Sequence, residues 1–125
     1  MAARMERLAH HDFLTGLPNR ALLNERLTQA IGMARRRGKQ VALLFLDLDY
    51  FKYINDSLGH AIGDLVLQIV AERLVACVRT TDTVCRRGGD EFVILLNGLP
   101  NLAECERAAG RLLQAVREPI VVHGH

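Results

Sequence analysis

Apolar residues recur along the first half of the chain with spacings that predict one helix and one strand. Between residues 21 and 36 the spacing is close to 3.6, which is typical of an amphipathic helix, and it is carried by Leu22, Leu23, Leu27, Ile31 and Ala34. Asn19 suits the start of this helix and Gly38 its end. Residues 41–47 form a short run that is apolar on both faces, which predicts a buried strand.

The second half of the chain continues the alternation of helical and extended segments. A second helix is predicted over residues 61–78, and a hairpin of two strands over 83–87 and 92–96. A third helix is predicted over 102–116, with Asn101 as its cap, and a further strand begins at 119–122. Turn-forming residues before the second helix predict a loop at Asn55, Asp56, Ser57 and Gly59. This order predicts an α+β fold in which helices cover an antiparallel or mixed sheet.

Composition and charge narrow the class of protein. A length of 125 residues indicates one domain, and a net charge of +2 argues against a nucleic-acid binder. The basic run at residues 35–37, with Lys39, is interpreted as a solvated helix end, and a patch that binds phosphate or a partner is the alternative. Three cysteines without a C-x-x-C spacing argue against a disulfide framework or a zinc site and favour the cytoplasm.

Two further features concern the ends and the environment of the segment. No apolar run approaches the length of a membrane span, so this segment is expected to make no membrane contact, although a parent protein could be anchored elsewhere. Residues 1–11 are interpreted as a linker helix that arrives from an upstream module, and residues 12–125 as the folded domain.

Acidic residues gather at two predicted turns. Asp47 and Asp49 end the buried strand and would share one face of it, while Asp90 and Glu91 lie on the glycine turn of the hairpin. If the two strands are neighbours, the four carboxylates converge, and such hard oxygen ligands suit Mg²⁺ together with phosphate oxygens. Ordinary solvated turns would explain the same residues.

Three motifs, in this order, resemble those of the GGDEF-domain diguanylate cyclases. They read DFLTGLPNR at residues 12–20, DLDYFKYINDSLGHAIGD at 47–64 and RRGGDEF at 86–92. The resemblance implies a ferredoxin-like palm similar to that of nucleotidyl cyclases. It also implies that the family domain continues past His125, so that this domain is incomplete at its C-terminal end.

The activity that the resemblance implies is the condensation of two GTP molecules to cyclic di-GMP and two pyrophosphates. It would need Mg²⁺ or Mn²⁺ and a homodimer, with the product as feedback inhibitor. Two alternatives remain open: a catalytically silent GTP-binding regulatory domain of a cyclic di-GMP phosphodiesterase, and a cyclic di-GMP receptor.

The resemblance assigns catalytic and metal-binding roles to a few residues. Asp47, the main-chain carbonyl of Leu48 and Asp90 would bind metal, and Asp47, Asp90 and Glu91 would be catalytic. Glu91 would either bind metal or activate the hydroxyl. Asp49 is interpreted as a supporting or structural group rather than a direct ligand.

Phosphate contacts are implied at two turns. The backbone N–H groups of Tyr50, Phe51 and Lys52, at a helix start, would hold the β- and γ-phosphates. Gly88 and Gly89 would let phosphates approach the backbone closely, because they have no Cβ.

Base contacts and an inhibitory site complete the implied set. Asn55 and Asp64 would bind guanine, because a carboxylate accepts from N1–H and the N2 amino group. Arg79 and Asp82 form an R-x-x-D sequence that would bind the inhibitory product, and a surface ion pair is the alternative. Asp12 and Arg20 are interpreted as a buried structural ion pair. His60 is given a structural rather than a catalytic role.

Overall fold

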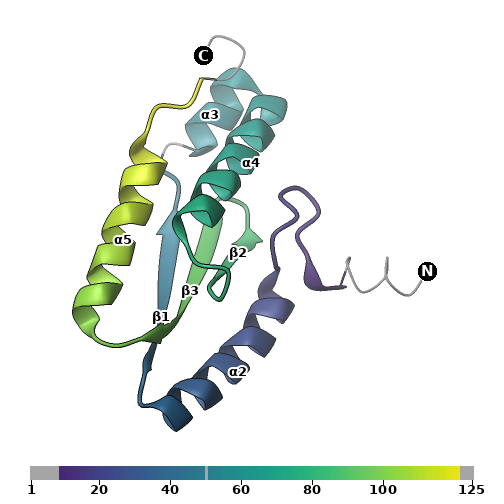
Figure 1. Cartoon of the computed structure of the whole chain (residues 1–125). Coiled ribbons are helices and arrows are strands. Elements are labelled where there is room, and N and C mark those ends of the chain that lie inside the picture. Colours follow the sequence, from purple (N-terminus) through teal and green to yellow (C-terminus); the bar gives the residue numbers. More distant parts are fainter. Residues whose placement is uncertain (1–8, 50, 122–125) are drawn as a thin grey trace.

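The computed structural model describes residues 9–49 and 51–121. In chain order its elements are α2 (Arg20–Arg37), β1 (Gln40–Asp47), α3 (Phe51–Leu58), α4 (His60–Cys77), β2 (Thr83–Gly88), β3 (Glu91–Leu99) and α5 (Leu102–Arg117) (Figure 1). Within this described part, no helix is both long and apolar enough to cross a membrane.

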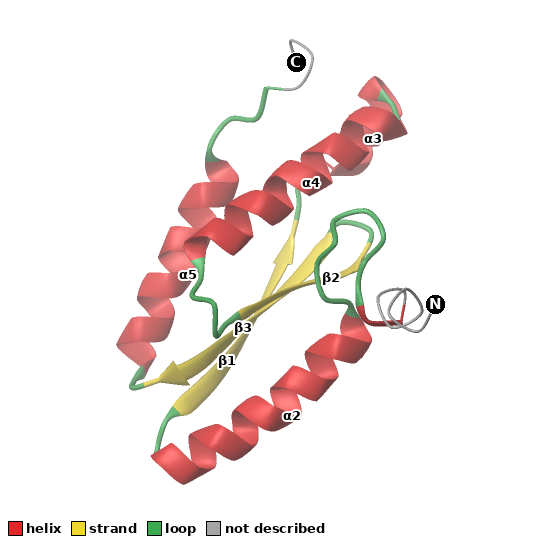
Figure 2. Cartoon of the chain, turned by 45° about the vertical axis from the view of Figure 1, so that its right-hand side comes forward, coloured by secondary structure: helices red, strands yellow, loops and turns green. Residues whose placement is uncertain are grey.

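The strands form an antiparallel sheet with the order β1-β3-β2, so that β3 lies in the middle. Leu44 of β1 and Val84 of β2 both pair with Ile94, and Asp47 pairs with Glu91 at one end of the sheet. Helix α2 covers one face, while α4 and α5 cover the other (Figure 2). The predicted α+β fold with helices on a central sheet is therefore confirmed.

Strand β3 divides the core into two layers because successive side chains of a strand point to opposite faces. Val93 and Leu95 pack toward α2, in a cluster with Leu23, Ala30 and Cys85. The alternate residues pack toward α4 and α5, in a larger cluster that includes Phe92, Ile94, Leu96, Leu67, Val70, Leu74 and Leu112. Burying each of these large apolar side chains stabilises the fold by about 1.5–3 kcal/mol.

Three predicted helix ends are confirmed by local geometry. The side chain of Asn19 accepts a hydrogen bond of 3.2 Å from the N–H of Leu22 at the start of α2. Gly38 ends that helix in the left-handed conformation, with φ of 65°. Asn101 accepts a bond of 3.0 Å from the N–H of Glu104 at the start of α5. Short-range chemistry therefore fixes these boundaries.

The predicted loop after β1 is wrong, because the turn-forming residues Asn55, Asp56 and Ser57 lie inside helix α3. Phe51 is buried in the core cluster and Ile54 is half-buried, and residues three apart share one face of a helix. Packing of that face outweighs the weak helix propensity of the polar residues. Only Gly59, with φ of 91°, breaks the helix before α4 begins.

The predicted strand at residues 119–122 is also wrong for its described part, since residues 119–121 have no strand structure; Val122 lies outside the described residues. The guanidinium of Arg73 on α4 instead donates to the carbonyls of Glu118 at 2.6 Å and Pro119 at 2.8 Å. The bond to Pro119 occupies a carbonyl of the predicted strand, which is thereby satisfied by α4 rather than by a neighbouring strand.

Candidate functional site

One end of the sheet brings the acidic residues together. Asp47 ends β1 directly opposite Glu91, which begins β3. Asp90 lies in the two-residue turn between β2 and β3, and its carbonyl accepts a hydrogen bond of 3.3 Å from the N–H of Leu48. The two strands are therefore neighbours, which was the condition for the carboxylates to converge, and Asp47, Asp90 and Glu91 share one edge with the backbone of Leu48.

The donor set at this edge fits a hard cation that keeps other oxygen ligands. Within the described part of the chain, the carboxylates of Asp47 and Asp90 form no hydrogen bond or ion pair, and Glu91 has only an exposed pair with Arg87 at 3.9 Å. No three acidic, histidine or cysteine side chains of these residues form a complete metal cage. One or two carboxylates with phosphate oxygens and water are what Mg²⁺ takes.

Arg86 holds the turn that carries Asp90. Its guanidinium donates to the carbonyl of Gly89 from Nε at 3.1 Å and from Nη2 at 2.9 Å. Its Nη1 donates to both carboxylate oxygens of Asp12, at 3.0 and 3.2 Å. The interpretation of Arg20 as the partner of Asp12 is therefore wrong, because Arg86 takes that place across the fold.

The opening loop is organised around Asp12. Its Oδ2 accepts from the N–H of Thr15 at 2.9 Å and from the hydroxyl at 2.7 Å. Burial raises the pKa of the Asp12 carboxyl, but the bonds from Thr15 and Arg86 outweigh it, so that the pKa lies below its usual value. The N–H of Arg86 also donates to the carbonyl of Pro18 at 3.1 Å. The loop and the hairpin turn are thus joined as one unit.

Of the two turns predicted to hold phosphates, the glycine turn leaves open space, and the other lies at a helix start. A Cβ at Gly88 or Gly89 would meet no atom within 4 Å, and both residues have positive φ, of 148° and 53°. Phe51 and Lys52 begin α3, whose first-turn N–H groups have no partner inside the helix. Phe51 itself is buried, so only its backbone can face a ligand. Tyr50 lies outside the described residues.

The structure brings Asn55 close to Asp64. Asn55 lies on α3, and its side chain packs against Gly63 of α4, which directly precedes the exposed Asp64. His60 begins α4 and is exposed. Helices α3 and α4 therefore place an amide next to the residue that precedes an exposed carboxylate, and these two groups together could bind a base with several donors and acceptors.

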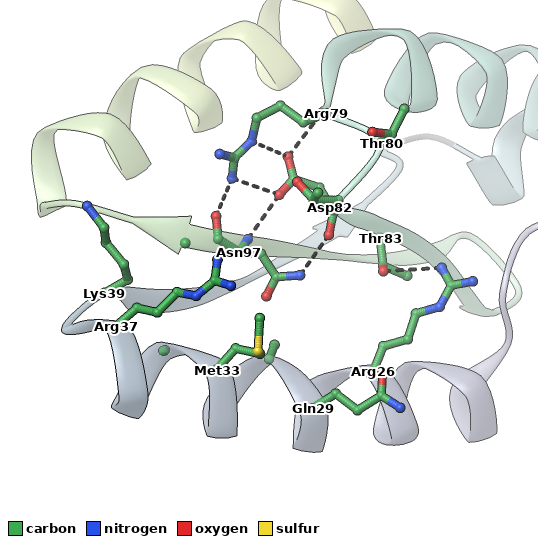
Figure 3. A pocket seen from close by; sticks show the side chains of 14 residues that line it. Arg26, Gln29, Met33, Arg37, Lys39, Arg79, Thr80, Asp82, Thr83 and Asn97 are labelled. Carbon is green, nitrogen blue, oxygen red and sulfur yellow. Dashed lines mark hydrogen bonds and ion pairs between the residues drawn. The ribbon is translucent and has the colours of Figure 1, made fainter.

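Arg79 and Asp82 bind each other (Figure 3). The carboxylate of Asp82 is 3% exposed and accepts from the N–H of Arg79 at 3.0 Å, from its guanidinium at 3.0 and 3.2 Å, and from the N–H of Asn97 at 2.9 Å. Its hydrogen bonds raise the pKa of Arg79. The guanidinium also donates to the carbonyl of Asn97 and is 55% exposed, so it remains within reach of a ligand.

A cavity of about 540 Å³ adjoins this pair, between α2 and the ends of β2 and β3 (Figure 3). Helix α2 and the segment after it contribute three cationic groups to this cavity, of which Arg26 has no role predicted from the sequence: Arg26, Arg37 and Lys39. Arg26 donates to the hydroxyl of Thr83 at 3.3 Å. The sequence favours a solvated helix end for the basic run. The structure instead places its last arginine and Lys39 beside the R-x-x-D loop, a position that depends on the tertiary fold.

Comparison with known families and proteins gives a consistent result. The family model described as "Diguanylate cyclase, GGDEF domain" matches residues 9–125. In Pseudomonas aeruginosa, the bifunctional diguanylate cyclase/cyclic di-GMP phosphodiesterase MucR is 48% identical over 118 residues, which are 94% of this chain and 17% of MucR. The cyclic di-GMP phosphodiesterase NbdA of the same organism is 46% identical over 122 residues, which are 98% of this chain and 16% of NbdA.

Solved structures show the same fold. The GGDEF domain of TpbB from Pseudomonas aeruginosa is 46% identical, with a TM-score of 0.87, over 91% of this chain and 66% of that one. The coiled coil and GGDEF domain of DgcB from Caulobacter crescentus, in complex with cyclic di-GMP, is 25% identical, with a TM-score of 0.84, over 98% of this chain and 64% of that one. The chain spans less than a fifth of the two curated relatives.

Proposed function

The chain belongs to the GGDEF family of diguanylate cyclase domains, and we propose that it provides one half of an active cyclase site, binding one GTP. Two such domains, facing each other, would join two GTP molecules into cyclic di-GMP and release two pyrophosphates. The observation that carries the proposal is the sheet edge, where Asp47 lies opposite Glu91 and Asp90 projects from the adjoining turn.

Mg²⁺ is the proposed cofactor, held by Asp47, Asp90 and the carbonyl of Leu48. When bound, it would supply charge neutralisation at the phosphates and lower the pKa of the attacking hydroxyl. The protein's own part would be to present Asp47 and Asp90, which have no other partner among the described residues, at the edge of the sheet. Glu91, opposite Asp47, would accept the proton of the 3′-hydroxyl or add a ligand.

The nucleotide would lie across helices α3 and α4. The first-turn N–H groups of α3, at Phe51 and Lys52, would bind the terminal phosphates, and the open turn at Gly88 and Gly89 would let them approach. Asn55 and Asp64 would bind guanine. Adenine lacks the N1–H and N2 donors that suit Asp64, so GTP should be preferred.

Each domain holds one nucleotide, so two domains must meet for cyclisation. Attack of each 3′-hydroxyl on the α-phosphorus of the other nucleotide forms one phosphodiester bond and expels one pyrophosphate. Product inhibition would act through Arg79 and the cations beside the 540 Å³ cavity. The DgcB structure contains cyclic di-GMP, which supports product binding by domains of this kind.

The second candidate is a GTP-binding domain without catalysis, and it is favoured by the similarity to NbdA, which is named as a cyclic di-GMP phosphodiesterase. The carboxylates of Asp47 and Asp90, which have no partner among the described residues, favour the cyclase. A receptor that binds cyclic di-GMP through Arg79 and Asp82 alone would not need those carboxylates.

The decisive experiment incubates the intact protein containing this domain with GTP and Mg²⁺ and identifies products by chromatography. Cyclic di-GMP should form with the native protein and fall at least a hundredfold with Asp90→Ala. Glu106→Ala removes the same charge from an exposed position on α5 and should leave the rate unchanged. No product, with GTP still bound, would favour the regulatory domain.

A further inference from the structure

Asn55 lies against α4 at a point where that helix has no side chain. A Cβ at Gly63 would lie 1.8 Å from Oδ1 of Asn55 and 3.0 Å from its Cγ. The amide oxygen therefore occupies space that any other residue at position 63 would fill. Gly63 is itself buried.

Among the neighbours of Gly63, the group that a side chain would collide with is the Asn55 carboxamide. The same Cβ would only touch the core, at 3.4 Å from Cζ of Phe51, a residue that is 9% exposed. The backbone links the two positions through Gly59, which donates to the carbonyl of Asn55 at 3.0 Å and accepts from Gly63 at 3.2 Å. A side chain at position 63 would therefore displace the Asn55 carboxamide rather than the helix or the core.

Backbone conformation gives no separate reason for glycine at this position. Gly63 lies inside α4 and is not among the glycines with positive φ. Glycine weakens the interior of a helix relative to alanine, because it loses more conformational freedom on folding. The structural benefit of Gly63 is therefore the space that it leaves.

The occupant of that space is itself unusual. Oδ1 of Asn55 is buried and has no hydrogen-bond partner among the described residues, which normally costs stability. The residue as a whole is only half-buried, so part of it stays accessible, and the exposed Asp64 directly follows Gly63 in α4. The oxygen end of the carboxamide is thus held by its packing against Gly63, and this sets the direction of the nitrogen end.

We propose that Gly63 is a positioning residue for base selection: the missing side chain seats the Asn55 carboxamide in the orientation that binds guanine next to Asp64. This inference rests on the proposed function, since it assumes that Asn55 and Asp64 bind the base. A methyl group at position 63 would turn the carboxamide away from Asp64. Contacts to the triphosphate and metal would be spared, because they arise at the sheet edge and at the start of α3.

The test uses the intact protein and calorimetric titration with non-hydrolysable analogues of GTP and ATP in the presence of Mg²⁺. Gly63→Ala should weaken binding of the GTP analogue at least tenfold and leave the weaker binding of the ATP analogue unchanged. Gly110→Ala is the matched control, because Gly110 lies in helix α5 and a Cβ there would meet no atom within 4 Å. It should bind both analogues as the native protein does.

A double-mutant cycle identifies Asn55 as the route of the effect. Asn55→Ala should also weaken the GTP analogue, and adding Gly63→Ala should weaken it no further, because the displaced carboxamide is already gone. In that background, Gly63→Ala should leave the melting temperature unchanged or raise it. This double variant keeps the test valid even where Gly63→Ala alone unfolds the protein.

Different results would contradict the binding of guanine by Asn55 and the positioning role of Gly63. A native protein that binds both analogues equally would refute guanine selection, and with it the proposed function of Asn55. A native protein that prefers the GTP analogue, combined with an unchanged preference in folded Gly63→Ala, would overturn only the role of Gly63. The role of Gly63 would also be overturned if the two substitutions weakened the affinity for the GTP analogue additively, or if the double variant failed to fold.

Discussion

Asp12 and Arg86 are 74 positions apart and meet through two hydrogen bonds of 3.0 and 3.2 Å. The pair is largely shielded, with side chains that are 17% and 14% exposed. Through the same guanidinium, the opening loop is connected to the carbonyl of Gly89 in the turn that carries Asp90. A shift of the opening loop would therefore move the turn that carries Asp90, because the Arg86 side chain is bonded to both.

Asp12→Asn should lower the free energy of unfolding by about 2 kcal/mol, because the charged acceptor of Arg86 and Thr15 is lost in a shielded place. Urea unfolding of the domain measures this. The control is Glu104→Gln, which breaks the exposed pair with Arg107 at 2.9 Å and should cost less than about 1 kcal/mol. Equal effects of the two substitutions would show that Asp12 has no special role.

The Asp12 carboxylate should make the free energy of unfolding depend on pH. Because the folded pKa of Asp12 lies below its ordinary value of 3.8, its contribution is fully present above that value and is lost as pH falls through the folded pKa. The difference in unfolding free energy between native protein and Asp12→Asn should be constant from about pH 6 to 5 and shrink below about pH 4. A difference that grew with acid would contradict the direction of the shift.

Local chemistry made part of this fold predictable from the sequence. Asn19, Gly38 and Asn101 act on backbone groups within a few residues of themselves, so their roles as helix ends followed from their type and place. The hairpin was equally predictable, because the glycine turn separates two β-prone runs. Helix α3 was missed because its stabilisation comes from burial of Phe51, which local propensity does not reveal.

Long-range relationships could not be predicted. Arg20 was the nearby candidate partner for Asp12, whereas Arg86 comes from another element of the fold. The convergence of acidic residues depended on β1 and β3 being neighbours, which the sequence left open. The seating of Asn55 against Gly63 required two packed helices, and no residue type alone would have signalled it.

Cys85 should be the least reactive thiol of the folded domain. It is 0% exposed, and burial raises the pKa of its thiol to about 11, whereas Cys77 and Cys105 are half-buried. Because the thiolate is the reactive form, iodoacetamide at about pH 8 should label Cys77 and Cys105 first and Cys85 only on unfolding. Peptide mass spectrometry with and without denaturant measures this. Early labelling of Cys85 would mean that the layer between α2 and the sheet opens readily.

Arg79 and Asp82 should respond differently to substitution, although they form one ion pair. Asp82→Asn should destabilise the fold by about 1–3 kcal/mol, since its buried carboxylate also accepts from the N–H groups of Arg79 and Asn97. Arg79→Ala leaves those backbone bonds in place and should be milder, because the guanidinium is 55% exposed.

If the pair belongs to the proposed inhibitory site, Arg79→Ala should weaken binding of cyclic di-GMP at least tenfold while GTP turnover at low product concentration is retained. Calorimetric titration of the intact protein and initial rates measure the two effects. Arg107→Ala, on α5, removes an exposed guanidinium outside the cavity and serves as the control. Because Arg79 is bound to Asp82 in the structure, a ligand must compete with Asp82 for the guanidinium. The affinity for cyclic di-GMP should also fall with rising salt concentration, because salt screens the contacts between the cations and the phosphates. Unchanged affinity in Arg79→Ala would make the pair purely structural and leave the cavity without its assigned ligand.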